Sequence, residues 1–141
     1  MATGTQAQPA ELLRDRGVRV TTQRLEVLEE LGRERDDVTA QALWRRLRER
    51  GSPTGLATVY RTLSLLNEKG VIDALSHQGT ELCYRLCTDT HHHHMVCANC
   101  HSVVEIDPCG LDGWLAEVAA RHAFVVTDHK VEVTGLCAVC R

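Results

Sequence analysis

HHHHMVCANC, residues 91–100, sets four consecutive histidines before a C-x-x-C pair, and a second such pair lies 36 residues further on. Four thiolates from two pairs match the tetrahedral sulfur cage of structural zinc, because soft thiolate ligands select zinc in a reducing cell. The competing interpretations are an iron–sulfur cluster and a redox dithiol, but a redox pair normally opens a helix in a thioredoxin-like βαβ setting, which this sequence lacks. The sequence therefore predicts a structural zinc site with four ligands: Cys97, Cys100, Cys137 and Cys140.

The histidine run predicts a second kind of metal site, which is exchangeable rather than structural. Side chains alternate between the two faces of a strand, so His92 and His94 point to one side and the other two histidines to the opposite side. Each histidine pair then needs one or two ligands from elsewhere in the chain. Residues of a predicted hairpin complete the first pair as a tetrahedral site with oxygen, sulfur and nitrogen ligands: Asp73, Cys87, His92 and His94.

The second histidine pair, His91 and His93, has weaker candidates for its remaining ligands. Asp112 lies off the apolar stripe of a predicted C-terminal helix, and His129 lies on a predicted strand. The alternative, that both are ordinary surface polar residues, stays open on the residues alone. The remaining histidines and two further cysteines are expected to be ordinary polar and small apolar residues: His77, His101, His122, Cys83 and Cys109.

The first half of the chain has the periodicity and caps of a helical domain. Residues 1–8 are expected to be disordered. Four helices are predicted at 9–17, from Thr21 or Thr22 to Leu31, from Thr39 to Gly51, and from Leu56 to Glu68. The last two, joined by a short turn with glycine, make a helix-turn-helix pattern, and a hairpin at 71–86 indicates its winged version. Any three-helix core can show this spacing by chance, so the pattern alone leaves that alternative open.

The register of the hairpin follows from the alternation of its side chains. A three-residue turn at 78–80 pairs Asp73 with Arg85 and Val71 with Cys87. A two-residue turn would mix apolar and polar side chains, so the first register is favoured. It places Asp73 and Cys87 near one another on the more polar face. The other face is then wholly apolar: Ile72, Ala74, Leu82, Tyr84 and Leu86.

The composition changes after Thr90, where a hinge is expected. Strands are predicted at 91–97, 102–106 and 124–136, with a helix that opens at Pro108 or Gly110 before the last strand. This order gives a small α+β module held together by zinc, and its uncovered apolar surface predicts pairing with a second copy. The apolar face of the helix comprises Leu111, Trp114, Leu115, Val118 and Ala119.

The totals bound the class of protein. With 141 residues and 4% aromatics, a small second domain is short of core, and structural zinc binding, worth roughly 10–16 kcal/mol in zinc peptides, offsets that shortage. Seven cysteines, no signal peptide and no apolar run of membrane length predict a soluble cytoplasmic protein. Net charge is −3, but the basic residues, nearly all arginine, lie in the first half and suit phosphate and base contacts. A solvated, salt-bridged helical surface is the simpler explanation for most of them.

Four segments together resemble the ferric uptake regulator family. They are the histidine–cysteine stretch, the terminal C-x-x-C pair, GLATVYRTL at 55–63 and GVRVTTQR at 17–24, and they span most of residues 10–141 in the family's order. Within the family the chain is most similar to the actinobacterial zinc uptake regulators, which share the unbroken histidine run and a cysteine at the position of Cys87.

The resemblance implies a homodimeric, metal-dependent repressor rather than an enzyme. It implies a winged helix-turn-helix DNA-binding domain at residues 1–88 and an α+β dimerisation and metal-binding domain at 89–141. By position, the cysteines match the structural zinc site and the set with Asp73 and Cys87 matches a regulatory site at the hinge. An additional metal site in the dimerisation domain is matched by His91, His93, Asp112 and His129.

The sequence departs from the family pattern at three places. Iron and peroxide sensors usually draw a regulatory histidine from near the segment that corresponds to Thr39, and this chain has none there. His101 stands where a glycine is common in the cysteine knuckle. Asp112 stands where zinc regulators often have glutamate.

The DNA contacts are expected from the start of the predicted fourth helix. Tyr60 and Arg61 lie where side chains reach base edges in the major groove, and an arginine–guanine contact is worth about 1–3 kcal/mol. Tyr60 could pack on a thymine methyl group. Core packing is its alternative role, but the family pattern favours DNA. Contacts to phosphates, and to the minor groove for the last of the set, are expected from Thr58, Ser52, Arg24, Gln23 and Arg19.

The sequence thus predicts a zinc-dependent repressor that binds palindromic operator DNA as a homodimer, with one structural and one or two regulatory Zn²⁺ ions per monomer. A thiolate ligand at Cys87 favours zinc over iron or manganese. The alternatives are a nickel or iron sensor of the same family and, from another class, a zinc-ribbon thiol oxidoreductase, for which no nucleophile–base pair stands out.

Overall fold

The computed structural model describes residues 8–34, 36–76, 81–86, 91–106 and 110–141. Its contacts divide the chain into two compact units, Met1–Cys87 and Thr88–Arg141, called the N-terminal and the C-terminal unit below. Within the described residues, no helix has both the length and the apolar character needed to cross a membrane.

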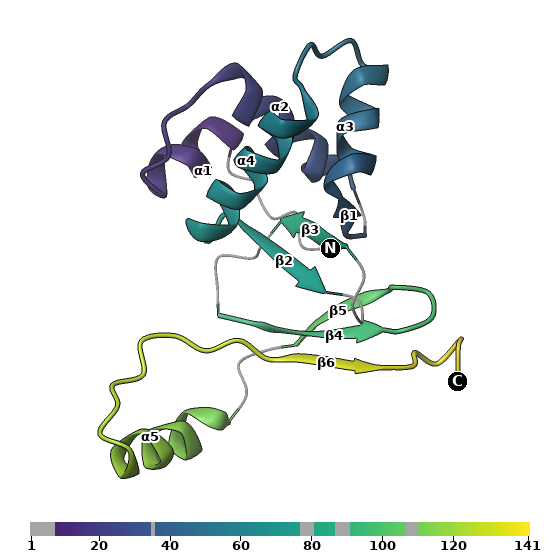
Figure 1. Cartoon of the computed structure of the whole chain (residues 1–141). Coiled ribbons are helices and arrows are strands. Elements are labelled where there is room, and N and C mark those ends of the chain that lie inside the picture. Colours follow the sequence, from purple (N-terminus) through teal and green to yellow (C-terminus); the bar gives the residue numbers. More distant parts are fainter. Residues whose placement is uncertain (1–7, 35, 77–80, 87–90, 107–109) are drawn as a thin grey trace. The chain divides into compact units, whose positions relative to one another are not determined.

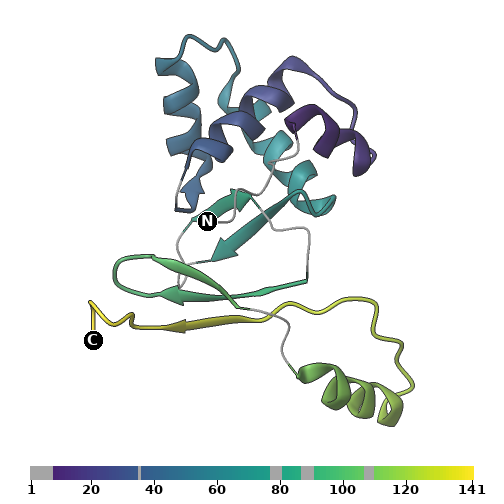
Figure 2. The same ribbon diagram turned by 180° about the vertical axis from the view of Figure 1, so that it is seen from behind.

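The N-terminal unit packs four helices on a three-stranded antiparallel sheet. Figures 1 and 2 show the helices gathered on one side of the sheet, in which β3 is central and the strand order is β1-β3-β2. The elements are α1 (Pro9–Asp15), α2 (Thr22–Arg33), β1 (Val38–Thr39), α3 (Ala40–Glu49), α4 (Leu56–Glu68), β2 (Ile72–Ser76) and β3 (Leu82–Leu86). Helices α3 and α4 with the β2–β3 hairpin confirm the winged helix-turn-helix prediction.

Short-range capping sets the bounds of these helices. The Thr21 side chain accepts a hydrogen bond from the backbone N–H of Arg24, so Thr21 rather than Thr22 caps α2. Thr39 caps α3 in the same way through the backbone N–H of Ala42. Gly51 follows α3 with φ of +83°, a left-handed conformation that ends a helix at little cost only for glycine.

The core of the N-terminal unit closes within the unit. Apolar side chains from α1 to α4 and from the sheet form one buried cluster, which includes Leu13, Leu28, Leu43, Leu63 and Tyr84. One buried charge sits at its edge, since the Glu30 carboxylate is 1% exposed. It forms ion pairs with Arg33 Nη1 at 2.9 Å and Arg50 Nε at 2.7 Å, which offset its desolvation and join α2 to the end of α3.

The hairpin has the register that side-chain alternation predicted. Asp73 pairs with Arg85, and Ala74 pairs with Tyr84. The further prediction, Val71 opposite Cys87, lies outside the described residues. The sequence did not predict β1, where Thr39 pairs with Cys83, because a two-residue strand has no alternation to detect.

The C-terminal unit is built on a second three-stranded sheet. Its elements are β4 (His93–Cys97), β5 (Val103–Ile106), α5 (Leu111–Arg121) and β6 (Glu132–Gly135). Strand β4 is central, antiparallel to β5 and parallel to β6. The helix begins after Gly110, and Pro108, the alternative start, lies outside the described residues.

One predicted strand is much shorter in the structure. The sequence predicted a strand over 124–136, but β6 begins only at Glu132. The residue before it, Val131, accepts a hydrogen bond from the His94 N–H through its carbonyl. Residues 124–131 form no strand, and valine and threonine favour strands only where a partner is available along their length. Phe124 and Val125 are accordingly 75% and 86% exposed.

Helix α5 keeps much of its predicted apolar face in solvent. It lies apart from the strands of its unit in both views of the chain (Figures 1 and 2). Trp114 is 57% exposed, and only Ala119 of the predicted face is buried. An uncovered surface of this kind is typical of an oligomer interface.

Candidate metal centres and nucleic-acid interface

The four predicted zinc ligands come together in the C-terminal unit. Their sulfur atoms lie within 4.8 Å of one another, with Cys100 Sγ and Cys137 Sγ 3.7 Å apart. Four sulfurs in tetrahedral array at about 2.3 Å from a zinc ion would be roughly 3.8 Å apart, so the donor set and spacing fit this metal.

Backbone hydrogen bonds build the two knuckles that carry the cysteines. The first knuckle follows β4, where the Cys97 N–H donates to the Ser102 carbonyl. The second follows β6, and the N–H of Ala98 donates to the Gly135 carbonyl across the two strands. The parallel pairing of β4 with β6 thus brings together cysteines that are far apart in the sequence.

The surroundings of the sulfurs favour thiolates at part of the site. Backbone N–H groups lower the pKa of Cys97 to about 6. One of them, the N–H of Cys137, donates to Cys97 Sγ at 3.4 Å. The Asn99 amide lies 3.3 Å from Cys140 Sγ and lowers that thiol's pKa, but the neighbouring thiols and burial outweigh it and raise the pKa to about 11. Four close sulfurs cannot all ionise at neutral pH without a cation between them.

Three of the four predicted ligands of the additional metal site also meet. The ligand nitrogens of His91, His93 and His129 lie within 4.8 Å of one another, and Nε2 of His91 is 3.2 Å from Nε2 of His129. His93 is 1% exposed, and its Nδ1 accepts a hydrogen bond from the Val131 N–H. Burial, followed by the neighbouring histidines, lowers the pKa of His93, which favours the neutral imidazole that binds metals.

The fourth predicted ligand is not part of this group. Asp112 lies exposed in the first turn of α5, and the structure does not bring it to the three histidines. The pairing of β4 with β6 brings the three histidines together, whereas Asp112 lies on a helix outside that sheet.

The predicted hinge site is only partly described. His92 and His94 lie on the same side of their segment, with ring centroids 4.8 Å apart, as strand alternation predicted. Asp73 lies on β2 of the N-terminal unit, and Cys87 lies outside the described residues. The complete ligand set therefore remains a prediction.

Helix α4 presents an outward stripe with the spacing i, i+3, i+4, i+7. Ala57, Tyr60, Arg61 and Ser64 are all exposed, whereas the opposite stripe, with Val59, joins the core. Tyr60 is 36% exposed, so it is not the core residue that the alternative interpretation required. Sequence reasoning missed Ala57 and Ser64, although their spacing from Arg61 on a helix would have identified them.

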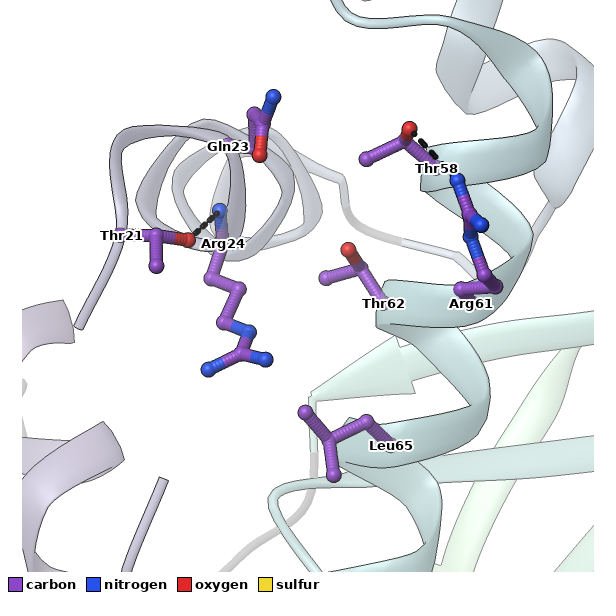
Figure 3. A pocket seen from close by; sticks show the side chains of 7 residues that line it. All are labelled: Thr21, Gln23, Arg24, Thr58, Arg61, Thr62 and Leu65. Atoms are coloured by element: carbon purple, nitrogen blue, oxygen red, sulfur yellow. Dashed lines mark hydrogen bonds between the residues drawn. The ribbon is translucent and has the colours of Figure 1, made fainter. Parts of the chain in front are cut away.

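Most of the predicted phosphate ligands line one pocket of about 430 Å³ between α2 and α4 (Figure 3). Arg24 Nη1 donates to the Arg19 carbonyl at 2.7 Å, and Arg61 Nη2 donates to Thr58 Oγ1 at 3.4 Å. No carboxylate of the described residues pairs with Arg24 or Arg61, so both guanidinium charges are available to an anion. The lining residues are Thr21, Gln23, Arg24, Thr58, Arg61, Thr62 and Leu65.

The two other predicted contacts to the DNA backbone and minor groove, Ser52 and Arg19, lie outside this pocket. The Ser52 hydroxyl donates to Glu26 Oε2 at 2.6 Å, and Thr54 Oγ1 donates to the same oxygen at 3.0 Å. A carboxylate beside Ser52 disfavours the approach of a phosphate. The Arg19 side chain is exposed just before α2.

Comparisons with known proteins give the same picture. Residues 15–134 match the model of the ferric uptake regulator family. The chain is 42% identical over 125 residues to the zinc uptake regulation protein of Mycobacterium tuberculosis, covering 89% of this chain and 96% of that protein. A solved structure of a zinc uptake regulator in complex with zinc and DNA aligns with TM-score 0.75 and 31% identity, over 94% of this chain and 89% of the other. The Vibrio cholerae ferric uptake regulator aligns with TM-score 0.66 and 32% identity, over 91% and 98%.

A winged-helix unit joined to a unit with clustered metal ligands defines a metal-responsive, DNA-binding transcriptional repressor. The chain belongs to the ferric uptake regulator family. The family consists of transcription regulators, which are not enzymes.

Proposed function

We propose that this protein is a zinc-responsive repressor that binds palindromic operator DNA as a homodimer when it is loaded with zinc. The choice of the sensed metal rests on the thiolate of Cys87 among the proposed hinge ligands, because thiolates prefer zinc to iron or manganese. Two relatives support it, the zinc uptake regulation protein of M. tuberculosis and the regulator solved with zinc and DNA.

In this proposal the two parts of the chain have separate tasks. Residues 1–88 read DNA through the outward stripe of α4, with Tyr60 and Arg61 at base edges and the pocket of Figure 3 facing phosphates. Residues 89–141 hold the metal and pair two copies of the chain. The exposed apolar side chains of α5 and of the segment after it, with Trp114 and Phe124 among them, support the pairing.

The proposed stoichiometry is one structural and one or two regulatory zinc ions per monomer. Zinc at the hinge ligands Asp73, Cys87, His92 and His94 would link the two units and fix the spacing of the two recognition helices. By linkage, DNA must tighten zinc binding by the same factor by which zinc tightens DNA binding, typically worth about 1–3 kcal/mol. The group His91, His93 and His129 is the second regulatory candidate, with Asp112 as its proposed fourth ligand.

The decisive experiment measures DNA binding in buffers of defined free metal. The probe is a palindromic duplex selected from a random-sequence pool by the zinc-loaded protein. We expect binding to be half-maximal at a lower free concentration of zinc than of nickel or iron(II). Half-maximal binding at far lower free nickel would instead identify a nickel sensor of the same family.

The same titration on Arg61→Ala tests the DNA-binding surface. Loss of an arginine–base contact costs about 1–3 kcal/mol, so the variant should bind the selected duplex roughly ten- to a hundredfold more weakly. Arg121→Ala, which removes an exposed arginine of the other unit, is the control of equal charge. Equal affinity of Arg61→Ala and wild type would contradict the proposed surface and leave room for a non-DNA role such as thiol chemistry.

A further inference from the structure

The side chain of Tyr60 on the recognition helix is held by the wing. Its hydroxyl donates a hydrogen bond to Glu81 Oε1 at 2.8 Å, which is the ordinary length for an O–H group and a carboxylate. Glu81 directly precedes β3, so the bond joins the outward stripe of α4 to the hairpin within one unit. The phenol therefore has a preferred direction before any DNA is present.

The position of Glu81 is unusual for a surface proposed to meet a polyanion. Its carboxylate lies exposed beside Tyr60, which immediately precedes Arg61 on the helix. A carboxylate here repels phosphates, so it weakens DNA binding of every sequence alike. Such a residue is compatible with the proposed function only if its hydrogen bond to Tyr60 improves discrimination between sequences more than its charge reduces affinity.

Glu81 can act in two separable ways, through its hydrogen bond to Tyr60 and through its negative charge. The acceptor oxygen fixes the phenol in one direction, which lowers the entropy cost of placing it against a base edge. The charge weakens contacts to phosphates, which supply essentially all of non-specific binding and part of specific binding. This hydrogen bond is also the first cause of the raised pKa of Tyr60, so the phenol keeps the proton that it donates.

Resting on the DNA-reading function proposed above, we propose that Glu81 is a specificity-determining residue that positions Tyr60 for base readout and suppresses non-specific DNA binding through its charge.

Three substitutions separate the two effects. Glu81→Gln keeps an acceptor oxygen and loses the charge, Glu81→Ala loses both, and Tyr60→Phe loses the donor. Each zinc-loaded variant is titrated with the selected duplex and with a scrambled duplex of equal composition at several salt concentrations. The discrimination ratio is the Kd for the scrambled duplex divided by the Kd for the selected one. Glu68→Gln, an exposed acid near the end of α4, controls for loss of one negative charge.

We expect Glu81→Ala to bind the scrambled duplex more tightly and to lower the discrimination ratio by about three- to tenfold, the worth of one hydrogen bond. Glu81→Gln should bind both duplexes more tightly and keep most of the ratio. In a Tyr60→Phe background, Glu81→Ala should change the ratio little, because the donor is already absent. Independent, additive effects of the two substitutions would overturn the positioning role, and so would a wild-type ratio in Glu81→Ala.

This test separates the inference from the function on which it rests. If the random pool yields no preferred sequence, or if Arg61→Ala binds like wild type, the DNA-reading function fails. If Arg61→Ala weakens binding as expected while Glu81→Ala keeps the wild-type ratio, only the role of Glu81 fails. Thermal unfolding of each variant checks that the fold is retained. We expect it to be retained, because Tyr60 and Glu81 are both exposed.

Discussion

At the scale of single residues, Cys83 shows how far the fold changes the chemistry of a side chain. It lies on the central strand β3, 7% exposed, and its thiol donates to the Glu81 carbonyl at 3.9 Å. Burial, then the nearby Asp37 carboxylate, raises its pKa from 9.0 to about 11. Cys83 is therefore a neutral, unreactive thiol near pH 7, in contrast to Cys97, and this agrees with its expected role as a small apolar residue.

This shift predicts a loss of stability at high pH. Because the folded chain keeps a proton that the unfolded chain releases, the stabilisation is complete below pH 9.0 and is lost as pH rises from 9.0 to about 11. Urea unfolding at pH 8 and pH 10.5 should show a smaller loss in Cys83→Ala than in wild type. The pH 8 values correct for any loss of packing in the variant. An equal loss in both proteins would show that Cys83 titrates normally in the fold.

At the scale of elements, helix ends are set by local hydrogen bonds and strand ends by distant partners. The start of α2 illustrates the first case, since the Thr21 side chain accepts the Arg24 N–H at 3.3 Å while Thr22 is the first helical residue. The start of β6 illustrates the second, since Glu132 becomes part of a strand only through its pairing with His94 on β4.

The assignment of the cap predicts unequal effects of two neighbouring substitutions. Thr21→Ala should lower the free energy of unfolding by about 0.5–2 kcal/mol, because it leaves a helical N–H without its side-chain acceptor. Thr22→Ala removes the same atoms from an exposed position and should change stability by less than about 0.5 kcal/mol. Urea denaturation of the two variants checks this prediction. A larger loss of stability in Thr22→Ala would show that Thr22, and not Thr21, caps α2.

At the scale of the whole molecule, the two units are stabilised in different ways. The N-terminal unit has a continuous buried core that includes Leu13, Leu28 and Leu63. The C-terminal unit has few buried apolar side chains, with Val96 and Ala119 among them, and leaves Trp114 and Phe124 exposed. Its sheet is closed at one end by the four-cysteine group, so we expect its stability to depend on metal.

Removal of zinc should therefore affect the two units unequally. After removal of zinc by a strong chelator, or in Cys137→Ser, the backbone amides of β4, β5 and β6 should lose protection from hydrogen exchange. The reason is that metal no longer ties β6 to the first knuckle. Amides of α2, α3 and α4 should keep theirs. Exchange measured by mass spectrometry reports each segment separately, and equal loss throughout the chain would contradict the division of stability between the units. Cys83→Ala, which lies outside the four-cysteine group, serves as the control.

Much of the fold could be predicted from the sequence because its signals are local. The cap at Thr39, the glycine that follows α3 and the helical spacing of the apolar residues in α4 can each be recognised within one or two helical turns. The pairing of Asp73 with Arg85 follows from alternation alone. The spacing of the two C-x-x-C pairs predicts which cysteines group together, because such pairs have few roles other than metal binding in a reducing cell.

The sequence by itself determined the class of the protein, the order of its helices, the hairpin register and the grouping of the four cysteines. The tertiary structure alone decided that β6 is short and parallel to β4, that three histidines gather without Asp112, and that Tyr60 is held by Glu81. The physical reason is range. Caps and alternation depend on neighbours along the chain, whereas these contacts join side chains 21 to 38 residues apart, which only the packed fold brings together.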